Sequence, residues 1–282
     1  MPTFAAPTPV PVVIDVPFGN LYVVAGERDD VVVSVLPADP SKSGSVRAAE
    51  ETRVERDGDA ISIVYPNAWK QYVLPFASGG AKVTIELPAG SDLRGKAGSL
   101  YAEGRLGTVD LNLNGGNARL DDVDRLDIKV SAGSLTVGRA SGTVDAVVSA
   151  GGLRVRELDG DATVKVPNGT TEIGRTTGSL RVNGAHGDIS IDRSHGDTVV
   201  RCAHGGIRVE QAVNGRVQLE SSYGSIEVGV PEGTAAWLDA TSQHGQVRNL
   251  LQDAAGPGES DLTVEVRAGT SYGDVIVRRP HP

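Results

Sequence analysis

Apolar and polar residues alternate with a period of two through the central part of the chain, and the alternation restarts after regularly spaced glycines. After Gly178, for example, Leu180 and Val182 are apolar and Arg181 between them is polar. Such alternation is typical of a β-strand with one buried face, whereas the 3.6-residue period of a helix would scatter these positions around its circumference. The pattern therefore predicts a series of short strands, each with an apolar and a polar face.

The glycines recur every nine residues from Gly133 to Gly205, with one residue missing between Gly116 and Gly133 and one inserted before Gly215. Nine residues hold a short strand and a turn, and so short a strand buries its apolar face only when successive repeats stack. We expect an all-β fold, a single-stranded β-solenoid with about 18 residues, or two half-repeats, in each coil. Glycine suits the corners because it accepts a positive φ and a close backbone approach.

The ends of the chain depart from this period. Residues 1–90 are expected to form an N-terminal β cap and the first irregular coils, with longer strands at 12–16, 21–25, 31–36, 60–65 and 81–87 and a short helix within 41–53. Residues 91–228 would form the regular solenoid, and 229–282 the C-terminal coils and cap. Because each coil packs on its neighbours, we expect one cooperative domain.

Composition excludes several classes of protein. The 282 residues carry a net charge of −9, which argues against nucleic-acid binding because a basic surface is needed to neutralise phosphates. Cys202, the single cysteine, excludes an intramolecular disulfide and a cysteine-based zinc cluster. No apolar run approaches the roughly 20 residues of a membrane-spanning helix, and the proline-rich start lacks the basic and apolar segments of a secretory signal. We therefore predict a cytoplasmic protein without membrane insertion.

The repeats resemble those of the bacterial putative-adhesin β-strand-repeat family, whose function is unknown. The resemblance rests on the steps GSLTV, GSLRV, GDISI and GSIEV at 133–137, 178–182, 187–191 and 224–228, and on the tail segments at 231–249 and 270–277. The segment at 35–55 resembles actinobacterial members. The resemblance implies a β-solenoid fold and supplies no catalytic motif.

Two histidines are the candidate metal ligands. With 18 residues in a coil, His186 and His204 would stack at one edge, with Asn168 below them and Tyr223 above, and His195 would lie at the opposite edge. Two imidazoles about 5 Å apart could contribute to a transition-metal site, but no third ligand is evident. The alternative is a surface ladder, because residues such as Asn and His tolerate the unusual φ of a corner. We expect no cofactor.

Catalytic chemistry finds little support in these residues. The chain has no G-x-S-x-G nucleophile elbow, and the register predicts no partner for Cys202. A carbohydrate-active solenoid enzyme would need a pair of carboxylates in a groove. The repeats, which are poor in aromatic residues, do not suggest such a groove.

An interaction role remains. We predict a non-enzymatic scaffold or binding protein that contacts a protein partner inside the cell, or associates with itself end to end. The candidate partner site is the aromatic cluster Trp69, Tyr72 and Phe76. A surface adhesin or glycan-binding protein is the alternative if the chain is exported.

Overall fold

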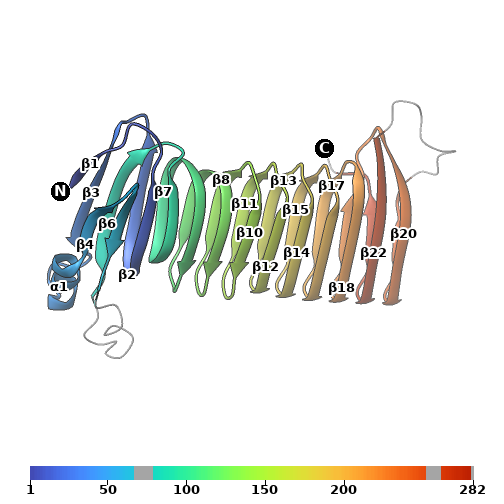
Figure 1. The fold of residues 1–282 in the computed structure, drawn as a ribbon. Helices are drawn as coiled ribbons and strands as arrows, with labels where there is room; N and C mark the ends of the chain where they lie inside the picture. Colours follow the sequence, from blue (N-terminus) through green and yellow to red (C-terminus); the bar gives the residue numbers. More distant parts are fainter. Residues whose placement is uncertain (67–78, 252–261, 281–282) are drawn as a thin grey trace. The chain divides into compact units, whose positions relative to one another are not determined.

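The computed structural model describes residues 1–66, 79–251 and 262–280. The fold is all-β apart from a short helix, with mostly parallel strands stacked in a solenoid-like arrangement, so the predicted fold class is confirmed at this level (Figure 1). The chain divides into two compact units, Met1–Ser141 and Gly142–Pro282. Each unit is described separately below. Among the described residues, no helix has the length and apolar character needed to cross a membrane.

The described part of unit 1 contains nine strands and the helix α1 (Ser43–Glu51), which falls inside the predicted segment 41–53. Its strands are β1 (Thr3–Ala5), β2 (Pro11–Gly26), β3 (Asp30–Pro37), β4 (Arg53–Asp57), β5 (Ala60–Val64), β6 (Ala81–Pro88), β7 (Asp92–Leu113), β8 (Ala118–Val130) and β9 (Leu135–Ala140).

Unit 1 contains both parallel and antiparallel strand pairs. Strand β2 pairs in parallel with β5, β6 and β7, and β7 with β8. Strands β1, β3 and β4 instead pair antiparallel, β1 with β3, β3 with β6 and β4 with β5. The strands predicted at 12–16 and 21–25 are one continuous strand, β2, whose register with β7 shifts between Val16 and Asn20. A register shift bends a strand without ending it, and the residue pattern alone does not distinguish this from a turn.

Unit 2 holds the regular repeats. Its strands are β10 (Val144–Val148), β11 (Leu153–Leu158), β12 (Ala162–Asn168), β13 (Thr171–Thr176), β14 (Leu180–His186), β15 (Ile189–Ser194), β16 (Thr198–His204), β17 (Ile207–Ala212), β18 (Gly215–Tyr223), β19 (Ile226–Gly229), β20 (Thr234–His244), β21 (Val247–Asn249), β22 (Leu262–Tyr272) and β23 (Val275–Arg278).

Parallel pairs in unit 2 join strands that are two apart in the chain. Leu153 of β11 lies beside Thr171 of β13, and Thr171 beside Ile189 of β15, so successive partners are 18 residues apart. The inserted residue before Gly215 changes the spacing to 19, which pairs Thr198 with Val217. The insertion therefore alters the loop and leaves the inward rows in register.

The inward positions of the repeat form the core. Val164, Val182 and Val200, which lie beside one another in β12, β14 and β16, are each 0% exposed. Two inward positions of the repeat carry threonine in place of an apolar residue, and these side chains, Thr171 and Thr198, are buried as well. The hydroxyl of Thr198 lies 2.7 Å from that of Ser194, so these buried groups form a hydrogen bond. This satisfies polar groups that would be costly to bury alone.

Glycine serves the two corners of the repeat in different ways. At one corner Gly169, Gly187 and Gly205 have φ of +144°, +123° and +154°, a backbone region that side chains rarely adopt. At the other corner Gly178 has no such φ, but a Cβ there would lie 2.5 Å from the backbone of Gly160 in the preceding coil. The nine-residue period therefore combines one conformational and one steric requirement.

Aspartates after corner glycines tie one coil to the next. A carboxylate oxygen of Asp161, Asp188, Asp197 or Asp274 accepts a hydrogen bond from a backbone N–H of the neighbouring coil, at 2.9, 2.7, 2.9 and 2.9 Å respectively. These contacts give the repeated Gly-Asp steps a structural role.

The last strands do not stack in sequence order. Strand β18 pairs with β22 and β19 with β23, and β20 and β21 then pair with the far sides of β22 and β23. The final strands of the chain are therefore inserted between two earlier coils (Figure 1). Within unit 2, β20 and β21 form the outermost coil.

Candidate functional site

Five exposed ring side chains form a continuous ladder along one corner of unit 2. They come from the ends of five neighbouring strands, β14, β16, β18, β22 and β20, whose register places each ring beside the next. In stacking order they are His186, His204, Tyr223, Tyr272 and His244. We call these five residues the ring ladder.

The rings are stacked nearly face to face. Centroids of successive rings are 5.0, 4.9, 4.8 and 4.6 Å apart, and neighbouring planes differ by 12°, 10°, 1° and 17°. The spacing is that of adjacent strands in a sheet, so the backbone register alone brings the rings into contact. Tyr223 and Tyr272 remain 51% and 46% exposed. Because the ring faces cover one another, the ladder presents mainly ring edges to solvent.

Each ladder residue immediately precedes a corner glycine. Gly187, Gly205, Gly224 and Gly273, which follow four of the five rings, have a positive φ and turn the chain at the same level of their coils, which keeps these rings in one column. The predicted stack of His186, His204 and Tyr223 is confirmed. Asn168 lies beside His186 in the register, as expected.

Tyr272 and His244 were not predicted to belong to the ladder. Both stand before a glycine, which is the signal that could have identified them. Their order in the stack, however, depends on the insertion of β22 between β18 and β20. Sequence spacing contains no indication of that insertion.

The stacked geometry differs from that of a chelating pair. Metal–nitrogen bonds of about 2.0–2.1 Å allow two ligating nitrogens to be at most about 4.2 Å apart. The rings of His186 and His204 are 5.0 Å apart and nearly parallel, so both would have to turn out of the stack to bind one ion. In the described part of the chain, no three His, Cys, Asp or Glu side chains are grouped to hold a metal ion. A metal at His186 and His204 stays a prediction.

The strand faces beside the ladder carry charges of both signs in pairs between coils. Arg201 lies 3.0 Å from Glu220, Arg154 lies 2.6 Å from Glu172, and Arg278 contacts both Glu227 and Glu210. Exposed pairs of this kind contribute little stability, typically less than about 1 kcal/mol each. Both signs of charge therefore occur near the ladder, which differs from these pairs in its rings.

Two other groups with catalytic potential are Cys202, whose thiol lies 3.5 Å from the carbonyl oxygen of Gly187, and His195. Burial raises the pKa of the Cys202 thiol, which is 5% exposed, and a raised pKa keeps the thiol protonated and a poor nucleophile. Burial and the nearby cations Arg175 and Arg193 lower the pKa of His195. Its Nε2 is buried without a hydrogen-bond partner, so this histidine is best understood as a neutral structural side chain.

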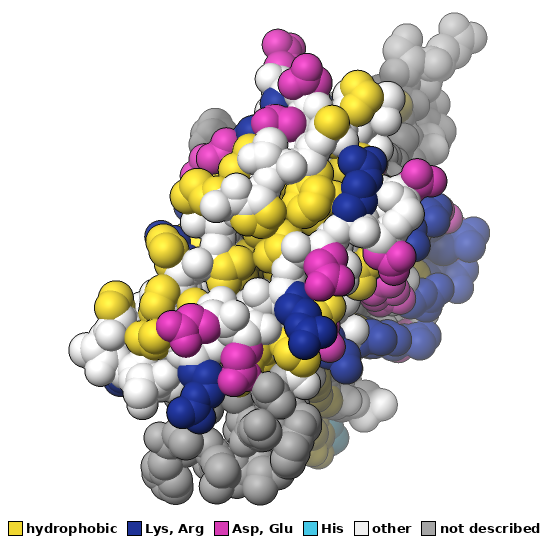
Figure 2. Space-filling model, turned by 60° about the vertical axis from the view of Figure 1, so that its left-hand side comes forward, with side chains coloured by type: hydrophobic (Ala, Val, Ile, Leu, Met, Phe, Trp, Pro, Cys, Tyr) yellow, Lys and Arg dark blue, Asp and Glu magenta, His cyan; other side chains and the backbone are white. Residues whose placement is uncertain are grey.

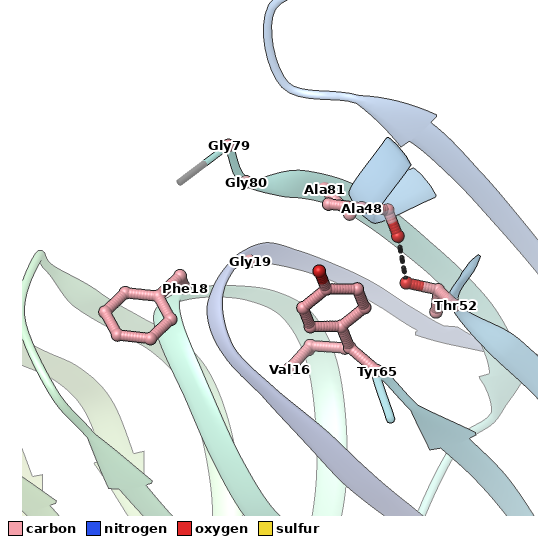
Figure 3. Close-up of a pocket in the computed structure, with 9 residues that line it drawn as sticks. All are labelled: Val16, Phe18, Gly19, Ala48, Thr52, Tyr65, Gly79, Gly80 and Ala81. Carbon is pink, nitrogen blue, oxygen red and sulfur yellow. Dashed lines mark hydrogen bonds between the residues drawn. The ribbon is translucent and has the colours of Figure 1, made fainter. Parts of the chain in front are cut away.

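The predicted partner cluster Trp69, Tyr72 and Phe76 lies outside the described residues. A small hollow in unit 1 lies next to described residues that flank 67–78. It is lined by residues of β2 and α1 and their neighbours, among them Val16, Phe18, Ala48, Thr52 and Tyr65 (Figure 3). Only about 10 Å³ of it is accessible to the centre of a water molecule, which is about the space that one water needs. The hollow is therefore too small to be argued as a ligand site.

Unit 1 also exposes apolar side chains, but in a different arrangement. Figure 2 shows hydrophobic side chains gathered in the middle of one face with acidic and basic side chains around them. Tyr22 and Tyr101 stack at 5.3 Å, and the Lys82 ammonium lies 4.7 Å from the Tyr22 ring centre. This pair is much shorter than the ring ladder and serves as a natural control for it.

Comparisons with known proteins identify a family. The profile of a family described as Toastrack DUF4097 matches residues 14–279. No curated protein matches the chain. The family match confirms the expected resemblance to a family of β-strand repeats. The actinobacterial character of residues 35–55 stays a prediction.

Three of the solved structures that are similar to this chain come from different bacteria. A "putative cell adhesion protein" from Clostridium sporogenes is 11% identical, with 98% of this chain and 94% of that chain covered and a TM-score of 0.20. A "putative adhesin" from Parabacteroides distasonis is 10% identical, with coverage of 98% and 95% and a TM-score of 0.31. Another from Bacteroides fragilis is 10% identical, with the same coverage and a TM-score of 0.28. At these low scores, no binding property is transferred from them, and none of the descriptions names an enzyme.

Proposed function

The chain belongs to the Toastrack DUF4097 family, and we propose that it is a non-enzymatic β-solenoid binding protein that presents the ring ladder to a protein partner. The proposed solenoid has coils of about 18 residues, with 1–90 and 229–282 as its irregular ends. Its location inside the cell is part of the same proposal.

The ring ladder is the observation that carries this proposal. Tyrosine is enriched among the residues that dominate protein–protein binding energy, because it buries a large rigid surface at a small entropic cost. Here the stacking already holds the rings, so a partner would immobilise few side-chain rotors on binding. Two exposed tyrosines at the centre of the ladder, Tyr223 and Tyr272, are the expected energetic anchors.

A protein surface fits this site better than a sugar. A glycan that stacks on open ring faces would find most of them covered by neighbouring rings, which are 4.6–5.0 Å apart. The accessible edges offer imidazole nitrogens and phenolic hydroxyls, which can donate and accept hydrogen bonds with backbone and side-chain groups of a partner. A surface adhesin that binds glycan remains the alternative function.

The test is site-specific photo-crosslinking followed by an affinity measurement. A photoreactive residue at Tyr223 should trap one host protein that the same residue at Tyr101 of unit 1 does not trap. With that protein purified, Tyr223→Ala should weaken binding by about 30-fold, the loss expected for a residue worth 2 kcal/mol, and Tyr101→Ala should leave it unchanged. Equal trapping at both positions, or equal affinity of both variants, would contradict the proposal.

Location and ligand class are tested on the same protein. If it is intracellular, protease added to intact host cells should leave it undigested while lysed cells lose it. Digestion on intact cells, together with glycan binding that Tyr223→Ala abolishes, would establish the adhesin alternative.

A further inference from the structure

The outermost coil of unit 2 leaves an apolar end uncovered by the described residues. Ala236, Leu238 and Ala240 of β20 occupy inward positions and yet are partly exposed. Their partners in β22, Val264, Val266 and Ala268, are only 1–2% exposed. The same contrast holds on the other side of the coil, where Val247 is 47% exposed and its partner Val275 is 0% exposed.

The outer edge of this coil also has backbone groups available. Strand β20 pairs with β22 from Thr234 to His244, and β21 with β23 from Val247 to Asn249. Within the described ranges, no strand pairs with their other edge. An unpaired edge favours the addition of another strand. We call the outer edge of β20 and β21 the open edge.

Leu250 and Leu251 follow β21, and Leu250 is 63% exposed, so apolar exposure continues past the strand. An occupant that pairs with the open edge would have to bring both a strand edge and apolar side chains.

We propose that the open edge pairs antiparallel with the open edge of a second copy of this chain, which closes a two-fold symmetric dimer. The inward row of β20 reads Ala236, Leu238, Ala240, small–large–small, and is the same in both directions. Antiparallel pairing centred on Leu238 places Leu238 opposite Leu238 of the other copy and Ala236 opposite Ala240. Opposite residues of an antiparallel pair lie on the same face, so both apolar rows remain inward.

The negative charge of Asp239 favours the same register. Asp239 is the only Asp, Glu, Lys or Arg in β20. Centring the pair on Asp239 would place two carboxylates opposite each other, which is unfavourable. Centring it on Leu238 instead places Asp239 opposite Trp237, whose ring is 55% exposed and whose indole N–H can donate to a carboxylate.

The outer strands of unit 1 differ from β20 and β21, because β1 and β4 pair antiparallel with β3 and β5. A head-to-tail addition could not continue the parallel stacking of β20 and β22, so growth into a filament is not expected. The symmetric pair is closed, because it uses the open edge of each copy.

Sedimentation velocity of the full chain tests the oligomeric state. Wild type should sediment as a dimer of twice 29.2 kDa, and Leu238→Asp should raise the dimer dissociation constant at least tenfold. Ser190→Asp adds the same charge at a partly exposed position of β15, away from the open edge, and should remain dimeric. Added salt should strengthen the dimer, because it screens the repulsion between two chains of charge −9. A wild-type monomer at all concentrations would overturn the proposal, and so would dimers of Leu238→Asp that are as tight as wild type.

Disulfide trapping tests the register and does not depend on how Leu238→Asp folds. Cα atoms of directly opposite residues are about 4.5–5.5 Å apart, within disulfide range. Leu238→Cys should therefore form an intermolecular disulfide under mild oxidation. Ala236→Cys alone should not, whereas the double variant Ala236→Cys with Ala240→Cys should. The native Cys202 is 5% exposed and should not interfere. Equal crosslinking of both single variants, or a series of higher crosslinked oligomers, would refute the closed dimer.

Tyr223→Ala should leave dimerisation unchanged, which separates this test from that of the ring ladder.

Discussion

Replacing Gly205 by alanine should destabilise unit 2 severely, whereas the same change at the adjacent Gly206 should not. Gly205 has φ of +154°, and a Cβ there would lie 2.2 Å from the carbonyl oxygen of Gly187 in the preceding coil. At Gly206 the nearest atoms, Asp188 Oδ1 and the carbonyl oxygen of Ser225, would be 3.5 Å from a new Cβ, an ordinary contact. The two sites differ in strain and hardly at all in sequence position.

The magnitude follows from two separate costs. A non-glycine residue in this backbone region costs about 1–3 kcal/mol, and overpacking a tightly stacked site costs about 1–3 kcal/mol more. The sum centres on about 4 kcal/mol, which corresponds to a fall in Tm of roughly 8–16 °C for a chain of this size. Gly206→Ala keeps the N–H that donates to Asp188 and should change stability by less than about 1 kcal/mol.

Thermal unfolding followed by far-ultraviolet circular dichroism measures both variants against wild type. Near-ultraviolet circular dichroism should also change in Gly205→Ala, because Gly205 follows His204 and the strain would disturb its 4.9 Å stacking on Tyr223. If Gly205→Ala and Gly206→Ala unfold within 2 °C of each other, the steric argument for the corner is wrong.

Two further predictions concern charged groups. His195 has a lowered pKa in the folded protein, so at pH values just below its unfolded pKa of about 6.5 the unfolded chain binds a proton that the folded chain does not. Stability should therefore fall as the pH drops from 7.5 to 5.5, and urea titrations should show a smaller fall for His195→Gln; an identical pH dependence would contradict this assignment. Arg278 is 9% exposed and contacts Glu210 and Glu227, so Arg278→Ala should cost about 1–3 kcal/mol in urea unfolding, because these two partly buried carboxylates would then share the single cation Arg208. Arg154→Ala breaks an exposed pair and is the control, which should cost less than about 1 kcal/mol.

The local residue pattern was sufficient to predict the regular strands of unit 2 and three of the five residues of the ring ladder. The position of each inward residue follows from alternation, which is why even Thr171 and Thr198 are buried as the repeat predicts. The stacking of His186 on His204 follows from the 18-residue spacing alone. Unit 1 was harder, because the register shift within β2 and the antiparallel strand β4 have no periodic signal.

The sequence by itself determined which residues point inward, where the corners occur and which coils are neighbours while the period lasts. These properties are local, since they depend on strand alternation and on the backbone freedom of glycine. Only the tertiary structure decided the order of the last coils, in which β22 lies between β18 and β20. That order adds Tyr272 and His244 to the ladder and leaves the inward row of β20 partly exposed. It could not be read from spacing, because any apolar strand edge can pair with any other, and the choice depends on contacts among residues far apart in the chain.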